Sequence, residues 1–183
     1  LYLAAKGLRR VDPRTLQDLD PPIDVSGAGL SVAKDGSLAA LVSGHDLNLV
    51  ELPGGRTRTV AWGAGYVDAV AVDPQGSVVA GGGTNGAVRF FSPDGTEIGG
   101  GRAGVPVESI TFAPNEGAVF VAARREGSPP VYICLEVPSG KQRWRLDDMA
   151  FRSSDRLAVS ADGKVVAFED HAGLHLLDAK TGA

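Results

Sequence analysis

The hydrophobic residues of this chain fall in short runs instead of on the evenly spaced positions of an amphipathic helix. Between residues 66 and 95, three such runs, VDAVAV, SVVA and AVRFF, alternate with segments rich in Gly, Pro, Asn and Asp. Runs of this length, rich in Val and Phe and bounded by turn-forming residues, predict antiparallel strands. No run has the length or spacing of a helix. The stretch therefore predicts three consecutive strands.

The same pattern recurs along the chain. One set of turns precedes the second strand of each unit and ends at Gly36, Gly76, Gly117 and Gly163. Another set follows the third strand and ends at Gly55, Gly95, Gly140 and Gly182. The glycines of each set recur every 40 to 46 residues or so, and a period near this value with about four strands per repeat is typical of β-propeller blades.

The pattern thus predicts an all-β chain, one β-propeller domain over 1–183, with repeats near 1–27, 28–64, 65–104, 105–148 and 149–183. About eighteen strands are expected, in three complete four-stranded antiparallel blades flanked by two partial ones. The first partial blade is expected to have its outer strand within 15–20, ended by Pro21-Pro22, because proline cannot donate to a strand ladder.

Propellers close with about four to eight blades. We therefore expect a segment of a seven-bladed ring, completed by the same protein or by a second chain. The alternative is a five-bladed ring in which the two partial blades complement each other.

Several phrases carry a resemblance to a known family. LSVAKDGSLAALVSG, VAVDPQGSVVAGG and LAVSADGKVVAFED are similar to the first hairpin of WD40 and WD40-like propeller repeats. GLHLLDAKTG resembles the family's third strand, with Leu177-Asp178 where a Trp-Asp pair would stand. The Gly-His pair and the third-strand Trp of the family are absent, so packing has to replace the hydrogen-bonded network that they usually build. The resemblance implies a propeller that binds proteins.

Composition narrows the function further. The net charge of −4 gives no electrostatic reason to expect nucleic-acid binding. The one cysteine, Cys134, lies in an apolar run and is expected to be a buried hydrophobic residue. No apolar run approaches the roughly 20 residues of a membrane span. We expect a cytoplasmic protein without a membrane partner. The sequence starts at Leu1 without a Met, so we expect its natural beginning to lie further upstream.

Motifs for cofactors and catalysis have simpler interpretations. Residues 81–86 and 99–104 both match G-x-G-x-x-G, but each run leads into a strand where a dinucleotide site needs a helix, so we interpret them as turns. The Asp-Gly turns lack the spacing of a calcium loop. Ser43, His45 and Asp46 lie too close together in one turn to form a catalytic triad. His175 is expected to be structural. We expect no metal and no cofactor.

One surface has the composition of a protein interface. The loops that enter innermost strands and those that join second to third strands share one rim of the predicted propeller. Arg, Trp and Tyr, which are enriched at binding hot spots, occur there. The rim candidates are Trp62, Tyr66, Arg102, Arg124, Arg125, Arg152, His45 and His171. A competing interpretation is that Trp62 packs between blades and the arginines are merely solvated.

The sequence favours a non-catalytic interaction scaffold or a sensor module. We expect it to be a regulatory segment of a larger bacterial protein, and the bacterial origin is inferred from the Ala-, Gly- and Arg-rich composition. The alternative is a propeller enzyme or small-molecule binder that uses the central channel. Such a site needs polar groups converging from several innermost strands, and those strands offer only Ser31, Asp68, Glu108 and Ser109.

Overall fold

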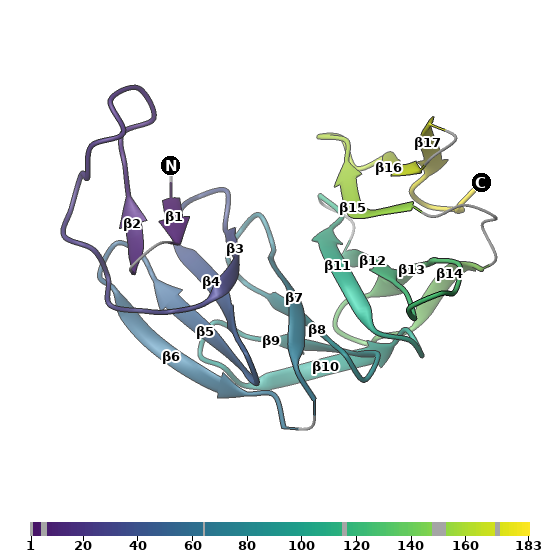
Figure 1. The fold of residues 1–183 in the computed structure, drawn as a ribbon, viewed down its shortest axis with the longest axis horizontal. Coiled ribbons are helices and arrows are strands. Elements are labelled where there is room, and N and C mark those ends of the chain that lie inside the picture. Colours follow the sequence, from purple (N-terminus) through teal and green to yellow (C-terminus); the bar gives the residue numbers. More distant parts are fainter. Residues whose placement is uncertain (1, 5–6, 64, 115–116, 148–152, 171–172) are drawn as a thin grey trace.

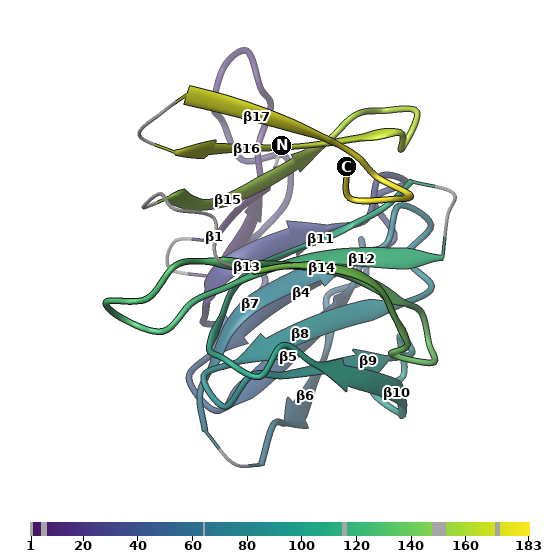
Figure 2. The same ribbon diagram turned by 90° about the vertical axis from the view of Figure 1, so that its right-hand side faces the viewer.

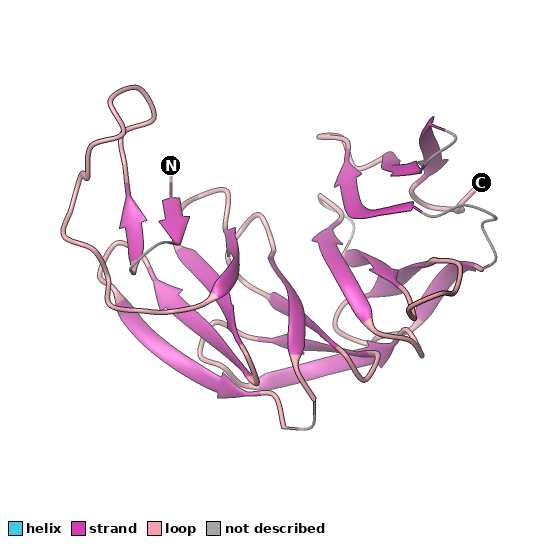
Figure 3. Ribbon diagram, viewed as in Figure 1, coloured by secondary structure: helices cyan, strands magenta, loops and turns pink. Residues whose placement is uncertain are grey.

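The fold is given by a computed structural model, which describes residues 2–4, 7–63, 65–114, 117–147, 153–170 and 173–183. The described residues form strands and loops only (Figure 3). None of them belongs to a helix that could cross a membrane. The sheets stand side by side along a crescent (Figure 1), and we number them as blades from the N-terminal end.

Three of the blades have four antiparallel strands in simple up-and-down order. Blade 1 contains β3 (Ala28–Val32), β4 (Leu38–Ser43), β5 (Asp46–Glu51) and β6 (Arg56–Ala61). Blade 2 contains β7 (Val67–Val72), β8 (Val79–Gly83), β9 (Ala87–Phe91) and β10 (Glu97–Arg102). Blade 3 contains β11 (Val107–Phe112), β12 (Ala118–Ala123), β13 (Val131–Glu136) and β14 (Gln142–Leu146).

The two ends of the crescent carry smaller sheets. Blade 4 has three described strands, β15 (Ser153–Val159), β16 (Val165–Asp170) and β17 (Gly173–Asp178). The first unit pairs β1 (Tyr2–Ala4) with β2 (Leu8–Arg10). The predicted outer strand within 15–20 is not formed. Isolated bridges join Val11 to Asp18 and Leu8 to Ile23, and Pro21-Pro22 lies between them. The two prolines lack the amide hydrogens that a continuous ladder would need.

Innermost strands line the concave side of the crescent (Figure 1). β3 contacts β7, β7 contacts β11, and β11 contacts β15. In blades 1 to 3 the second strand is covered on both faces by neighbouring sheets, and β12, for example, is buried along its whole length. This explains their unbroken apolar sequence, because a strand buried on both faces has no solvent side for polar residues.

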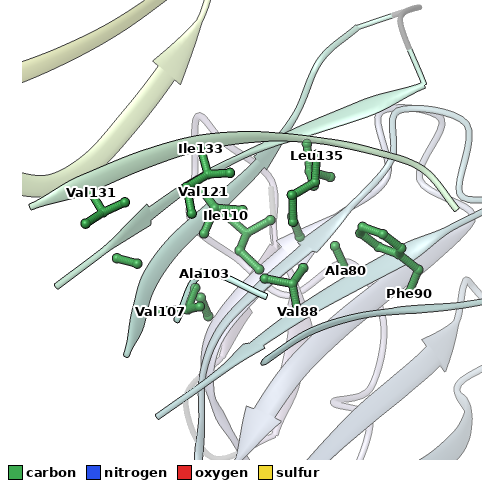
Figure 4. Close-up of a cluster of buried hydrophobic side chains, with 14 residues drawn as sticks. Ala80, Val88, Phe90, Ala103, Val107, Ile110, Val121, Val131, Ile133 and Leu135 are labelled. Atoms are coloured by element: carbon green, nitrogen blue, oxygen red, sulfur yellow. The ribbon is translucent and has the colours of Figure 1, made fainter. Parts of the chain in front are cut away.

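The hydrophobic core is divided among the seams between consecutive sheets. Separate clusters of buried residues fill the seams between the first unit and blade 1, and between blades 1 and 2, 2 and 3, and 3 and 4. In the seam of blades 2 and 3, Phe90 and Val88 meet Ile110 and Leu135 (Figure 4). Packing between blades therefore holds the crescent together.

The glycine runs have a different role from the predicted one. Gly81–Gly83 lie within β8 and Gly99–Gly101 within β10, and only the last glycines of the two motifs are in turns. A Cβ atom on Gly81 would stand 2.8 Å from Trp62 Cζ3, and one on Gly83 would stand 2.6 Å from Trp62 Nε1. The motifs are thus strand segments without side chains, against which a neighbouring blade packs closely.

A related contact recurs at the turn after each third strand. The outermost segment of each sheet covers a turn glycine of the next: Ile23 on Gly55, Val60 on Gly95, Gly100 on Gly140, and Trp144 on Gly182. At each glycine an added Cβ would come within 3.2 Å of the covering atoms. Trp144 also donates a hydrogen bond of 2.9 Å from its Nε1 to the carbonyl oxygen of Ala179. We call this repeated contact the glycine latch.

Carboxylates stabilise the hairpin turns and give the fold a predictable acid response. The Ser92 hydroxyl and the Thr96 amide donate hydrogen bonds to Asp94, which lowers its pKa to about 2. Ser160 lowers the pKa of Asp162, and the Thr181 amide and hydroxyl lower that of Asp178. Hydrogen bonds to a charged carboxylate favour the ionised form.

We therefore expect the free energy of unfolding to fall as pH drops from about 4 toward 2. An unfolded Asp has a pKa of about 3.9. A carboxylate whose pKa is lowered in the folded state stabilises the fold fully at pH values above its unfolded-state pKa. This contribution is lost as the pH falls through the folded-state pKa. Replacing Ser92 with Ala should raise the pKa of Asp94, as measured by NMR titration, and weaken the pH dependence. An unchanged titration would contradict the role of the Ser92 hydroxyl.

Candidate protein-interaction rim

The rim consists of two sets of loops joined by backbone hydrogen bonds. His45 lies in the turn between β4 and β5, and its carbonyl oxygen accepts a bond from the Trp62 amide. Tyr66 lies in the loop that enters β7, and its carbonyl oxygen accepts a bond from the Thr84 amide. In blade 3 the Arg124 amide donates in the same way to Pro106. The loops that were expected to share one rim are therefore directly connected.

An aromatic pair stands at the junction of blades 1 and 2. The rings of His45 and Tyr66 stack with centroids 4.1 Å apart and planes 29° apart. His45 Nδ1 lies 2.7 Å from the carbonyl oxygen of Gly65, which fixes the imidazole against the loop. Tyr66 nevertheless remains 55% exposed. The pair thus presents a supported aromatic surface to solvent.

Tyr66 is linked to the next turn and to an exposed arginine. The Thr84 hydroxyl accepts a hydrogen bond of 3.1 Å from the Tyr66 amide. Asn85, the following residue, accepts a bond of 3.4 Å at its carbonyl oxygen from the Arg102 guanidinium. We call the surface formed by His45, Tyr66, Asn85 and Arg102 the rim patch. All four side chains are exposed, and they come from blades 1 and 2.

The other predicted rim residues have different surroundings. Arg125 is exposed in the loop after β12. Arg124 is half-buried and forms an ion pair with Glu108, with 3.2 Å between its Nη2 and the Glu108 Oε1. Arg152 and His171 lie outside the described residues.

Trp62 is not a surface residue, so its prediction as a rim contact is wrong. Its side chain is fully buried in the seam between blades 1 and 2. The ring packs over the glycines of β8 and beside Phe91, with 6.3 Å between centroids. The Arg89 guanidinium lies 4.9 Å from the centre of the indole and donates a hydrogen bond of 2.7 Å to the Trp62 carbonyl oxygen. Apolar contacts with strand glycines favour this position over exposure to solvent.

The innermost strands enclose a hollow of about 400 Å³ between β3, β7 and β11. Lys34 is the one ionisable side chain among the described residues that line it. Two of the polar groups expected in the channel already have partners. Ser31 Oγ accepts a hydrogen bond of 2.9 Å from the Val72 amide, and Glu108 is paired with Arg124. Asp68 is exposed on β7, at the point where the register with β8 shifts.

Among the described residues, no three or more His, Cys, Asp or Glu side chains come together as the ligands of a metal ion would. Cys134 is buried and packed in the seam between blades 3 and 4.

Comparison with known proteins identifies the fold. No family model matches the sequence, and no curated protein is similar to it. Among solved structures, Kuenenia stuttgartiensis hydrazine synthase superposes on 90% of this chain with a TM-score of 0.73 and 13% sequence identity. The match covers 49% of that chain, so this chain spans about half its length. The chain is an all-β protein built of four-stranded β-propeller blades, as the sequence predicted, and at this identity the likeness concerns the fold alone.

Proposed function

We propose that this chain is a non-catalytic protein-interaction module and that the rim patch is its binding surface. The observation that carries the proposal is the stacked pair of His45 and Tyr66, which is held in place by the loop yet exposed. A preordered aromatic surface loses little conformational entropy when a partner covers it. Arg102 adds a charged donor beside it, and Tyr and Arg are the side chains that most often dominate binding energy.

The surroundings of the hollow support an interaction module over the enzyme alternative. General acid–base or nucleophilic catalysis needs titratable groups held within hydrogen-bond reach of one another. The lining of the hollow offers Lys34 among backbone, aliphatic, aromatic and hydroxyl groups.

Site-specific crosslinking would test this proposal. A photoreactive phenylalanine derivative at position 66 should capture one recurring protein in cells that naturally make this chain. The control carries the same derivative at Thr57, which is exposed on the outer strand β6. Equal capture at both positions would contradict the rim patch as a binding surface.

With the captured partner purified, we expect Tyr66→Ala to weaken binding by at least about tenfold, because truncating an aromatic hot spot costs about 2 kcal/mol or more. Arg102→Ala should weaken binding less. Thermal unfolding of both variants should match that of the parent, because both side chains are exposed. The control Thr57→Ala should bind normally. Unchanged binding by both rim variants would place the contact elsewhere.

A further inference from the structure

β10 forms an open edge of blade 2. It pairs with β9 on one side, and among the described residues no strand pairs with its other side (Figure 2). The whole of blade 3 follows β10 in the chain, so this edge belongs to the four-stranded blade itself. An edge strand offers amide and carbonyl groups with which a further strand can pair.

Charge distinguishes β10 from the outermost strands of the other complete blades. β6 and β14 each carry two arginines and no acidic residue. Like charges directly opposite each other destabilise an antiparallel pair, so neither strand should pair with a second copy of itself. β10 begins with Glu97, ends with Arg102 and has no charge in between. Two copies of this strand that run in opposite directions therefore bring opposite charges together.

The middle of β10 has little that would hinder an approaching strand. Residues 99–101 are three consecutive glycines, and all three are partly exposed. Ile98, at the bulge where the register with β9 shifts, is 39% exposed. A large apolar side chain at an edge favours contact with a further surface, because burial removes its apolar area from water.

The bulge also sets the direction of the two charged side chains. Side chains alternate between the two faces of a strand, and one extra residue reverses that alternation. Glu97, on the far side of the bulge, therefore shares a face with Gly100 and Arg102. The position of Arg89 agrees, because Arg89 pairs with Gly100 and its Nη1 lies 3.8 Å from Glu97 Oε2. Both ends of the strand thus present their charge on one face.

We propose that β10 is a self-association strand, through which two copies of this chain pair their edges antiparallel about a two-fold axis at Gly100. This axis sets Gly99 of one copy opposite Gly101 of the other, and Arg102 opposite the bulge. Every contact occurs twice by symmetry. Two pairs of opposite charge fix the register, which a strand of glycines alone would leave weakly specified.

A second copy fits this edge better than a foreign strand does, because the sequence EIGGGR supplies its own complement when it runs in the opposite direction. Six residues from each copy make an interface below the standard size, so we expect a weak dimer with a Kd between about 1 µM and 1 mM. The inference concerns the chain by itself and does not rest on the proposed function, although Arg102 also belongs to the rim patch.

Sedimentation equilibrium of the purified chain, at concentrations that span this range, should show a monomer–dimer equilibrium. Ile98→Lys should weaken dimerisation by at least about tenfold, because it removes the apolar contact and sets a positive charge opposite Arg102 of the other copy. The control Thr57→Lys places the same charge on the exposed β6 edge and should leave the equilibrium unchanged. Both variants should keep the parental melting temperature, because both side chains are exposed.

Charge reversal tests the register of the pairing. Glu97→Arg and Arg102→Glu should each weaken dimerisation about tenfold, since each reversal creates like-charge pairs on both sides of the axis. The double variant restores opposite charges and should dimerise within about threefold of the parent.

A parent chain that stays monomeric up to about 1 mM would overturn the proposal. So would a dimer that Ile98→Lys or the single charge reversals leave intact, or a double variant that dimerises no better than the single ones. None of these outcomes bears on the rim patch, whose test measures the capture of a different protein.

Discussion

Replacing Gly140 with alanine is expected to lower the free energy of unfolding by about 2 to 5 kcal/mol. An added Cβ would overlap the Gly100 carbonyl oxygen and press on the Gly101 amide nitrogen, and both belong to the backbone of β10. Overpacking of this kind costs about 1 to 3 kcal/mol and at times more. The φ angle of Gly140 is +68°, which adds about 1 to 2 kcal/mol for a residue with a Cβ.

Gly44→Ala provides the matched control for this loss. Its φ angle is +63°, but no atom lies within 4 Å of an added Cβ. The Gly44→Ala variant should therefore lose only the free energy needed to hold a residue with a Cβ at a positive φ angle, about 1 to 2 kcal/mol. Urea unfolding followed by tryptophan fluorescence measures both variants. Equal losses at the two positions would mean that blades 2 and 3 do not approach each other as closely as the glycine latch requires.

Trp62→Ala is expected to destabilise the fold by about 3 to 5 kcal/mol, as large buried aromatic residues usually do when truncated. The side chain is fully buried, and its removal would leave a cavity bounded by the β8 glycines, Leu47 and Phe91. Strand glycines have no side chains that could move to fill it. Chemical denaturation monitored by far-UV circular dichroism measures this loss.

Tyr66→Ala is the natural comparison, since Tyr66 lies four residues away and is exposed. It should change the free energy of unfolding by less than about 0.5 kcal/mol. Trp62→Phe should fall between the two, because part of the volume is kept. If Tyr66→Ala were as destabilising as Trp62→Ala, the aromatic pair at the rim would have a structural role in place of the proposed binding role.

Most strands could be predicted because their limits are encoded locally. The sequences VESITF, AVFVAA and QRWRL form β11, β12 and β14. Turn residues flank each of them, and apolar runs specify burial. The prediction of a strand within 15–20 was wrong. This short polar segment precedes two prolines, and it forms a single bridge, from Asp18 to Val11, in place of a ladder.

The functions of glycine and tryptophan could not be predicted so well, because they depend on a neighbouring blade. Gly81 and Gly83 resembled a turn when considered alone, and their role appears only when Trp62 is placed over them. For Trp62 the sequence left two interpretations open, a rim contact and packing between blades, and the structure confirms the second. By contrast, His45 and Tyr66 were predicted to share a rim, and the structure stacks them. Their role as binding residues remains a prediction.

The glycine latch has a consequence for how related sequences should diverge. Most latches join a turn glycine to a covering side chain roughly one repeat away, such as Gly95 with Val60 or Gly182 with Trp144. A bulkier residue in place of the glycine can be accommodated only if the covering side chain becomes smaller, because both occupy the same small volume. Natural variants should therefore show paired substitutions at these spacings, and the pairs would record which blades have been neighbours throughout the history of the protein.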